Sequence, residues 1–272
     1  MREPRVAVII PCFNDGELAV KAIRSIDESE PVEVVVIDDG STDPASKAAL
    51  AAEEQCGTRV IWQENTGLCG ARMRGVAETE AKYVFPLDSD DLMLPGSLAS
   101  LADTLDAHDD AGFAFGDVEY FGDDEFVAPA PEFDPWLTLY GNFWSPSIML
   151  RRTVIDATGG WSLDDYYEDW DLMMTLAQDG YTGVHCGRTT FRHRNHGFRM
   201  LNRARLRHAE LYERLVERHR DLFQRKRELA RTSPNASRWA RLTFPVRYGS
   251  ARRFVPASIE TRAFAIKRAL RG

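Results

Sequence analysis

The chain lacks most features of secreted, membrane-spanning or metal-cluster proteins. Its four cysteines lie far apart and form no Cys-x-x-Cys pair, which argues against a disulfide framework and against a zinc site. No apolar run approaches the roughly 18 to 20 residues of a membrane helix, and the first residues have neither the apolar region nor the cleavage site of a signal peptide. We therefore expect a cytosolic protein that is soluble or attached peripherally to a membrane.

What remains is the composition of a globular protein. The 272 residues are 44% hydrophobic and 28% charged, enough for one or two hydrophobic cores, which excludes a disordered, collagen-like or coiled-coil chain. Charge is divided unevenly. Residues 1–189 hold 12 basic and 36 acidic groups, a net charge of −24, whereas residues 190–272 hold 22 and 6, a net charge of +16.

This asymmetry has two interpretations. The basic tail packs against the acidic body, or it faces an anionic membrane surface. Nucleic acid is a poorer partner, because the tail shows no known RNA or DNA module and the acidic body repels phosphate. We divide the chain into a domain over residues 1–200 and a basic, largely helical extension over residues 201–272.

Short apolar runs alternate with helical segments over the first 107 residues. The runs are rich in β-branched residues and do not alternate with polar ones, as is typical of strands buried on both faces of a parallel sheet. Asn14 and Glu17 suggest a capping box for the first helix, and Asp43 an N-cap for the second. The pattern predicts an α/β fold with a mostly parallel central sheet flanked by helices. The predicted strands are 6–10, 32–37, 60–62 and 83–87.

Beyond Gly112 the pattern is weaker. We expect a strand over 113–121, a loop over 123–135, a strand over 147–150 and a helix over 169–178. Residues 202–230 are predicted to be helical, and the last forty residues are not assigned. The apolar side of that helical region is expected to carry Leu206, Leu211, Leu215 and Leu222.

Two carboxylate clusters follow predicted strands directly. The second strand leads directly into Asp38 and Asp39, and the fourth leads directly into Asp88, Ser89, Asp90 and Asp91. Because the carboxyl ends of parallel strands meet at one edge of the sheet, we expect these side chains to share a crevice. Crowded carboxylates raise one another's pKa unless a cation lies among them, and an all-oxygen ligand set suits Mg²⁺ or Mn²⁺.

A second acidic group opens the helix near residue 169. Glu168 and Asp169 lie in its first turn, where the helix dipole favours the ionised carboxylate that a general base requires. Helix capping alone is the rival interpretation. Trp161 lies just upstream and offers a flat apolar face to a sugar.

Five motifs in order resemble family 2 glycosyltransferases of the GT-A fold. They are VAVIIPCFN at 6–14, VVVIDDGSTD at 34–43, ENTGLCGARMRG at 64–75, LDSDDLMLP at 87–95 and GGWSLDDYYEDWDL at 159–172. The resemblance covers roughly the first 200 residues. It implies a nucleoside-diphosphate-sugar transferase that uses a divalent metal and inverts the anomeric centre. The donor would be a UDP-, GDP- or dTDP-sugar, and the acceptor a hydroxyl group of a glycan, a lipid-linked sugar or a small molecule.

The resemblance also implies roles for individual residues. Asp39, with Asp38 beside it, would bind the nucleotide base, and Asp88 would face the ribose or the diphosphate. Arg72 would lie close to the nucleotide, although Met73 stands where the family commonly has asparagine. The turn that would shape the base pocket contains Pro11, Phe13 and Asn14.

The remaining implied roles concern the metal and the acceptor. Asp90 would ligate Mn²⁺ or Mg²⁺, and His193 or His196 could join it. Asp169 would be the general base, with Glu168 and Trp161 in the acceptor site. Two other functions stay open: a catalytically silent nucleotide-sugar-binding module, and a sugar nucleotidyltransferase, which is disfavoured because the first strand does not lead into a glycine-rich phosphate loop.

Overall fold

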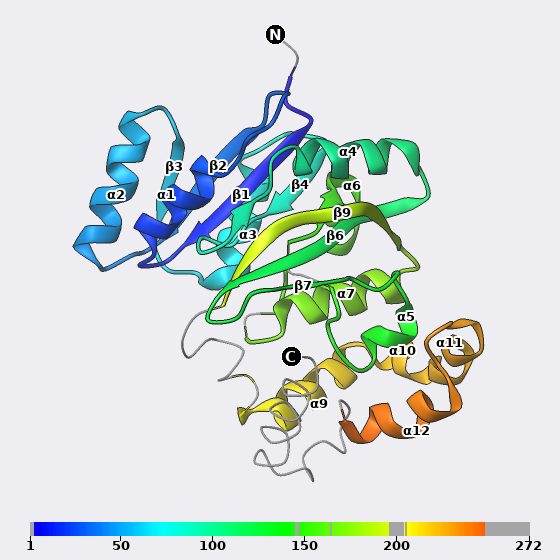
Figure 1. Ribbon diagram of the computed structural model, residues 1–272. Coiled ribbons are helices and arrows are strands. Elements are labelled where there is room, and N and C mark those ends of the chain that lie inside the picture. Colours follow the sequence, from blue (N-terminus) through cyan, green and yellow to red (C-terminus); the bar gives the residue numbers. More distant parts are fainter. Residues whose placement is uncertain (1–2, 145–146, 164, 196–203, 205, 248–272) are drawn as a thin grey trace.

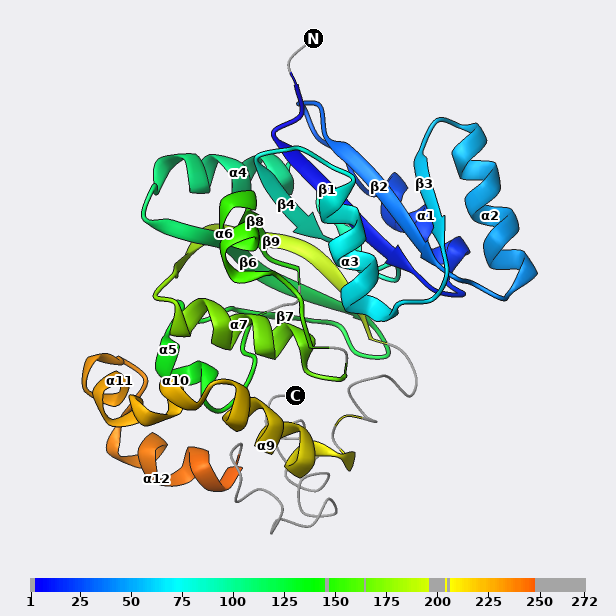
Figure 2. The same cartoon turned by 180° about the vertical axis from the view of Figure 1, so that it is seen from behind.

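The computed structural model describes residues 3–144, 147–163, 165–195, 204 and 206–247 (Figure 1). These residues form one mixed sheet with helices on both faces and a group of helices at one end (Figure 2). The strand order is β3-β2-β1-β4-β8-β6-β9-β5, with β7 paired to β6. The strands are β1 (Val6–Cys12), β2 (Glu33–Asp39), β3 (Arg59–Gln63), β4 (Tyr83–Pro86), β5 (Leu92–Met93), β6 (Ala111–Gly122), β7 (Phe126–Ala128), β8 (Met149–Arg151) and β9 (Thr182–Asn195).

The helices fall into two groups along the chain. Those of the sheet-containing part are α1 (Gly16–Arg24), α2 (Pro44–Gln55), α3 (Gly67–Ala77), α4 (Ser97–Ala107), α5 (Pro135–Thr138), α6 (Arg152–Thr158) and α7 (Glu168–Gln178). Those of the C-terminal extension are α9 (His208–Arg218), α10 (Arg220–Gln224), α11 (Lys226–Thr232) and α12 (Arg238–Arg247).

The parallel part of the sheet is formed by β1 to β4, as the alternating pattern predicts. Strand β1 pairs in parallel with β2 and β4, and β2 pairs in parallel with β3. Beyond β4 the pairing is mixed: β8 is antiparallel to β4 and β6, whereas β9 is parallel to β6. The carboxyl ends of β1 to β4 therefore lie at one edge.

The sheet separates two hydrophobic cores. Val8 and Ile10 of β1 face the core formed with α1, α2 and α4, whereas Ile9 faces the core formed with α3, α6 and α7. Helix α3 lies close to β1 at Gly75, where an added Cβ would overlap the side chain of Ile9. This close approach fixes α3 across the sheet and so fixes the position of Arg72.

The extension shares the second of these cores. Leu215 and Leu222 belong to the same hydrophobic cluster as residues of β1, β6 and α7, and the Tyr212 hydroxyl donates to the Leu139 carbonyl at 2.7 Å. Buried Asp171 of α7 accepts hydrogen bonds from the Arg218 side chain. The described part of the basic extension thus packs against the acidic body.

Several local predictions were wrong. Asn14 does not cap α1, whose N-cap is Asp15 with no side-chain cap hydrogen bond; Asn14 has a φ of 62° and bonds to the β2–α2 loop instead. Leu206 is 80% exposed and does not lie on an apolar side. Strand β7 lies within the predicted loop, and β9 was not predicted. By contrast, the predicted N-cap Asp43 does accept hydrogen bonds from the first turn of α2.

Among the residues that the structure describes, no helix has both the length and the apolar character needed to span a bilayer.

Candidate active site

The first part of the site is the turn after β1. Asn14 Oδ1 accepts hydrogen bonds from the backbone N–H groups of Thr42 at 2.7 Å and Asp43 at 2.8 Å. Its own N–H donates to Ser41 Oγ at 2.8 Å. The turn is thereby joined to the loop after β2. Pro11 is buried, whereas Phe13 is 48% exposed and lies at the surface of this turn.

The two carboxylates at the end of β2 have different surroundings. Asp39 Oδ1 accepts from Thr66 N and Gln63 Nε2, and Oδ2 accepts from Gly67 N, so this carboxylate lies against the N-terminus of α3. Asp38 is 2% exposed; its Oδ1 accepts from Ser41 N, while its Oδ2 has no hydrogen-bond partner among the described residues. The roles of Gln63, the last residue of β3, and Thr66, the N-cap residue of α3, were not predicted; only their place at the carboxyl end of the third strand and in the motif at 64–75 could have indicated them.

Arg72 lies at the centre of the site. Its side chain is 1% exposed, and it donates to Asp88 Oδ1 at 2.9 Å and to Asp169 Oδ1 at 2.7 Å. Its guanidinium carbon lies 5.4 Å from the centre of the Trp161 ring. One buried cation on α3 therefore joins the loop after β4 to the first turn of α7. Arg72 and Asp169 are 97 residues apart in the sequence.

The start of α7 carries the second acidic group. Tyr167, which precedes it, has a φ of 76°, an uncommon conformation for a residue with a side chain. Burial and the neighbouring Asp169 carboxylate raise the pKa of Glu168 to about 8, and burial raises the pKa of Asp169 against the opposing effect of Arg72.

Asp169 is held by two donors. Besides Arg72, the indole N–H of Trp161 donates to Asp169 Oδ1 at 3.2 Å. The Asp169 side chain is 19% exposed, so it reaches solvent from a largely buried position. Trp161 itself is 2% exposed. The structure therefore shows Trp161 orienting Asp169, while its contact with an acceptor stays a prediction.

A further acid, Asp91, organises the loop after β4. It is fully buried, its Oδ2 lies 2.8 Å from His193 Nδ1, and its Oδ1 accepts from the Arg194 N–H. Burial raises the pKa of Asp91 to about 6, and the His193 contact opposes that rise. Asp91 thus joins β9 to the segment that contains Asp90. The Arg194 side chain also donates a hydrogen bond to the backbone carbonyl oxygen of Asp90. His196 lies outside the described residues.

Together these contacts form one continuous edge. Asp39 contacts the start of α3, Arg72 lies within α3, and Arg72 contacts Asp88 and Asp169. The predicted nucleotide-site residues and the predicted base are therefore joined through a single helix. Arg72 opposes the effect of burial on the pKa of Asp169 and so favours its ionised form, the form that can remove a proton next to a polyanionic ligand.

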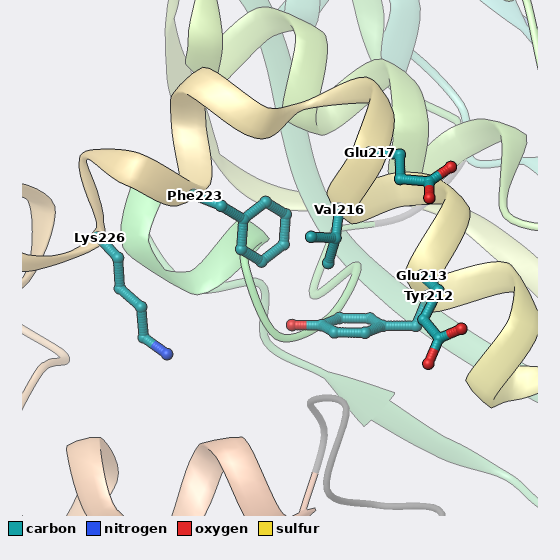
Figure 3. A pocket seen from close by; sticks show the side chains of 6 residues that line it. All are labelled: Tyr212, Glu213, Val216, Glu217, Phe223 and Lys226. Atoms are coloured by element: carbon teal, nitrogen blue, oxygen red, sulfur yellow. The ribbon is translucent and has the colours of Figure 1, made fainter.

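A pocket of about 350 Å³ lies elsewhere, among the C-terminal helices (Figure 3). None of its lining comes from the loops after β1, β2 or β4, so it is not part of the edge described above. Its lining residues are Tyr212, Glu213, Val216, Glu217, Phe223 and Lys226.

The raised pKa of Glu168 predicts a pH-dependent stability. The folded state holds a proton that the unfolded state, with an ordinary pKa of 4.5, has lost, so this stabilisation is complete below pH 4.5 and disappears as the pH rises through about 8. We expect the free energy of unfolding to fall by on the order of 3 kcal/mol between pH 5 and 8 through this group.

Urea unfolding of Glu168→Gln across this pH range measures the effect. The variant should lose most of the fall, whereas Glu54→Gln, at an exposed position on α2, should keep it. Equal pH profiles for Glu168→Gln and the parent protein would show that Glu168 titrates normally.

Comparison with known proteins identifies the family. Residues 7–162, more than half of the chain, match the family model described as glycosyl transferase family 2. The chain belongs to glycosyltransferase family 2. Succinoglycan biosynthesis protein ExoU of Rhizobium meliloti is 38% identical over 99 residues, which cover 35% of this chain and 29% of ExoU.

Two further proteins extend the comparison. An N-acetylglucosaminyltransferase of Azorhizobium caulinodans is 32% identical over 111 residues, covering 38% of this chain and 28% of the relative. Residues 1–349 of S. aureus TarS, crystallised with UDP-GlcNAc, superpose with a TM-score of 0.61 at 19% identity, covering 72% of this chain and 60% of that chain. The match therefore spans less than two thirds of each of these proteins, and the TarS likeness establishes the GT-A fold.

Proposed function

We propose that the chain transfers a sugar from a nucleoside-diphosphate donor to a hydroxyl acceptor, with inversion at the anomeric carbon. The observation that carries this proposal is the placement of Asp169: it lies on α7, bonded to Arg72 and Trp161, and the same Arg72 guanidinium also bonds Asp88. Family membership supports the reaction class. The crystals of TarS with UDP-GlcNAc and with UDP favour a UDP-sugar as the donor.

In this proposal a residue of the chain itself accepts the proton of the acceptor hydroxyl. Asp169 takes the proton of the acceptor hydroxyl as its oxygen attacks the anomeric carbon, and the bond from that carbon to the donor phosphate breaks with its electron pair leaving on the nucleoside diphosphate. Attack opposite the leaving group inverts the configuration. Arg72 favours the ionised form of Asp169 before transfer, because its charge opposes the effect of burial on the pKa of that carboxyl.

A divalent cation fits the donor set. The described residues contain no group of three or more His, Cys, Asp or Glu side chains able to hold a metal by themselves. Mg²⁺ is typically held by one or two carboxylates together with substrate phosphates, which matches Asp90 and Asp88 beside a bound diphosphate. His193, oriented by Asp91, is a further candidate ligand. When bound, the cation would neutralise charge on the departing diphosphate.

Ligand-dependent thermal unfolding tests the donor and the metal together. At a UDP concentration about 100-fold above its Kd, with Mn²⁺ present, we expect about 2.7 kcal/mol of stabilisation and a rise in Tm of about 5 to 8 °C. GDP and dTDP should give smaller shifts, and UDP without a metal should give little.

The matched variants are Asp90→Asn and Asp110→Asn. The first should lose the metal-dependent part of the shift, and the second, at an exposed position before β6, should keep it. A full shift in Asp90→Asn would remove Asp90 from the metal site, and no shift with any nucleotide would favour a degenerate pocket. The anomeric configuration of the product, read by NMR, tests inversion.

A further inference from the structure

Helix α12 exposes large apolar side chains on its outward face. Trp239 is 77% exposed and Leu242 is 68% exposed. The opposite face is the packed one, because Ala240 is 7% exposed and the Phe244 ring stacks on buried Trp136 with 5.4 Å between ring centres. Helix α12 is therefore anchored by one apolar face and presents a second one outward.

The spacing places these side chains together. Residues three and four apart are neighbours on a helix surface, so Trp239 and Leu242 form one patch and exposed Arg238 borders Leu242. A solvated helix face normally carries polar residues, and a Trp and a Leu side by side among arginines are typical of helices that lie in a membrane interface. In both Figure 1 and Figure 2, α12 lies at the end of the molecule remote from β1, β2 and β3.

The exposed charged side chains of α10, α11 and α12 are mostly basic. Across α10, α11 and α12 the exposed acids are Asp221 and Glu228, of which Glu228 pairs with Arg225 at 3.6 Å. The exposed arginines of these helices are Arg220, Arg225, Arg227, Arg231, Arg238 and Arg241.

We propose that the outward face of α12 is a docking surface for a bilayer that contains anionic lipid. Trp239 and Leu242 enter the boundary between headgroups and acyl chains, where an indole ring combines an apolar body with a polar N–H. Arg238 and the arginines of α10 and α11 bind the headgroups, each contributing an attraction that falls off within a Debye length. Charge complementarity selects this occupant, because a second copy would bring the same positive charge to the interface.

Vesicle flotation of the full chain tests the surface without reference to catalysis. The protein should float with phosphatidylcholine vesicles that contain about 30% phosphatidylglycerol and stay in solution with pure phosphatidylcholine. Trp239→Ala with Leu242→Ala should weaken vesicle binding about 20-fold or more, and Arg238→Gln should weaken it about fivefold.

Matched substitutions show whether a loss of binding is specific to α12 or follows from removing any exposed leucine or arginine. Leu206→Ala removes an equally exposed leucine outside α12, and Arg24→Gln removes an exposed arginine from the acidic body; both should bind vesicles as the parent protein does. Bilayer-embedded bromolipids should quench tryptophan fluorescence in the parent protein, and the quenching should fall in Trp239→Phe.

Three outcomes would overturn the proposal. The first is equal vesicle binding by the Trp239/Leu242 double variant and the parent protein. The second is equal binding of the parent protein to neutral and anionic vesicles. The third is that the parent protein binds no vesicles but forms a dimer in light scattering, and that the double variant is monomeric. Circular dichroism and the Tm of each variant show whether it is folded, so that a loss of binding in a folded variant supports the surface directly.

Discussion

Asp169→Asn should lower kcat by about 10³-fold while leaving nucleotide affinity within about threefold of the parent protein. The amide has nearly the shape of the carboxylate, and its oxygen can still accept from Arg72 and Trp161, as Asp169 Oδ1 does. It cannot take a proton from an acceptor. The substitution therefore removes the base but keeps the contacts that hold the side chain in place.

Release of UDP from a UDP-sugar measures this effect even with water as the acceptor, because water also has to lose a proton as it attacks. UDP affinity is measured in parallel by calorimetry. The same substitution at the other end of α7, Asp179→Asn, is the control: Asp179 is exposed and should leave kcat unchanged within about twofold. Turnover of Asp169→Asn within about tenfold of the parent protein would exclude Asp169 as the base.

The parallel half of the fold could be predicted because its signal is local. Strands buried on both faces are continuous apolar runs, and the residues that follow them lie at one edge whatever the rest of the chain does. Strand β9 could not be predicted in this way. Its sequence is mostly polar and shows no alternation of apolar and polar residues, in keeping with its position in the fold, where only Thr190 and Phe191 are buried.

The acidic residues of the site could be named from sequence, but their interactions could not. Asp39 lies at the carboxyl end of β2, close to its predicted place, but its carboxylate accepts hydrogen bonds from β3 and the start of α3. Asp91 was grouped with Asp88 and Asp90, and its contact with His193 depends on the unpredicted β9. Such contacts join segments up to about a hundred residues apart, which no local pattern encodes.

The C-terminal extension illustrates the same limit. Its leucine pattern identified Leu211, Leu215 and Leu222 as buried and also included Leu206, which is exposed. The spacing alone could not distinguish them, because Leu206 precedes α9, which begins at His208, and so does not share the helix that carries Leu211 and Leu215. The pairing of Arg218 with Asp171 likewise required the three-dimensional structure.

The second large effect concerns stability. Arg72→Met should lower the free energy of unfolding by about 3 to 5 kcal/mol, because removing one partner of a buried ion pair leaves the other charge uncompensated. Here two carboxylates, Asp88 and Asp169, lose their cation at once. Denaturant unfolding measures the loss. Arg74→Met on the same helix removes an exposed pair with Glu78 and should cost less than about 0.5 kcal/mol.

The pH dependence of this loss identifies its cause. Without Arg72 the pKa of Asp169 should rise further, so the Arg72→Met variant gains stability relative to the parent protein as the pH falls from 7.5 to 4.5 and the carboxylates bind protons. Asp169→Asn in the Arg72→Met background should recover part of the loss, since it removes one uncompensated charge. The alternative result is a loss of stability that is the same at both pH values and the same with and without Asp169→Asn. That result would indicate a packing defect, and the charge of Arg72 would then contribute nothing to holding α7 against the loop after β4.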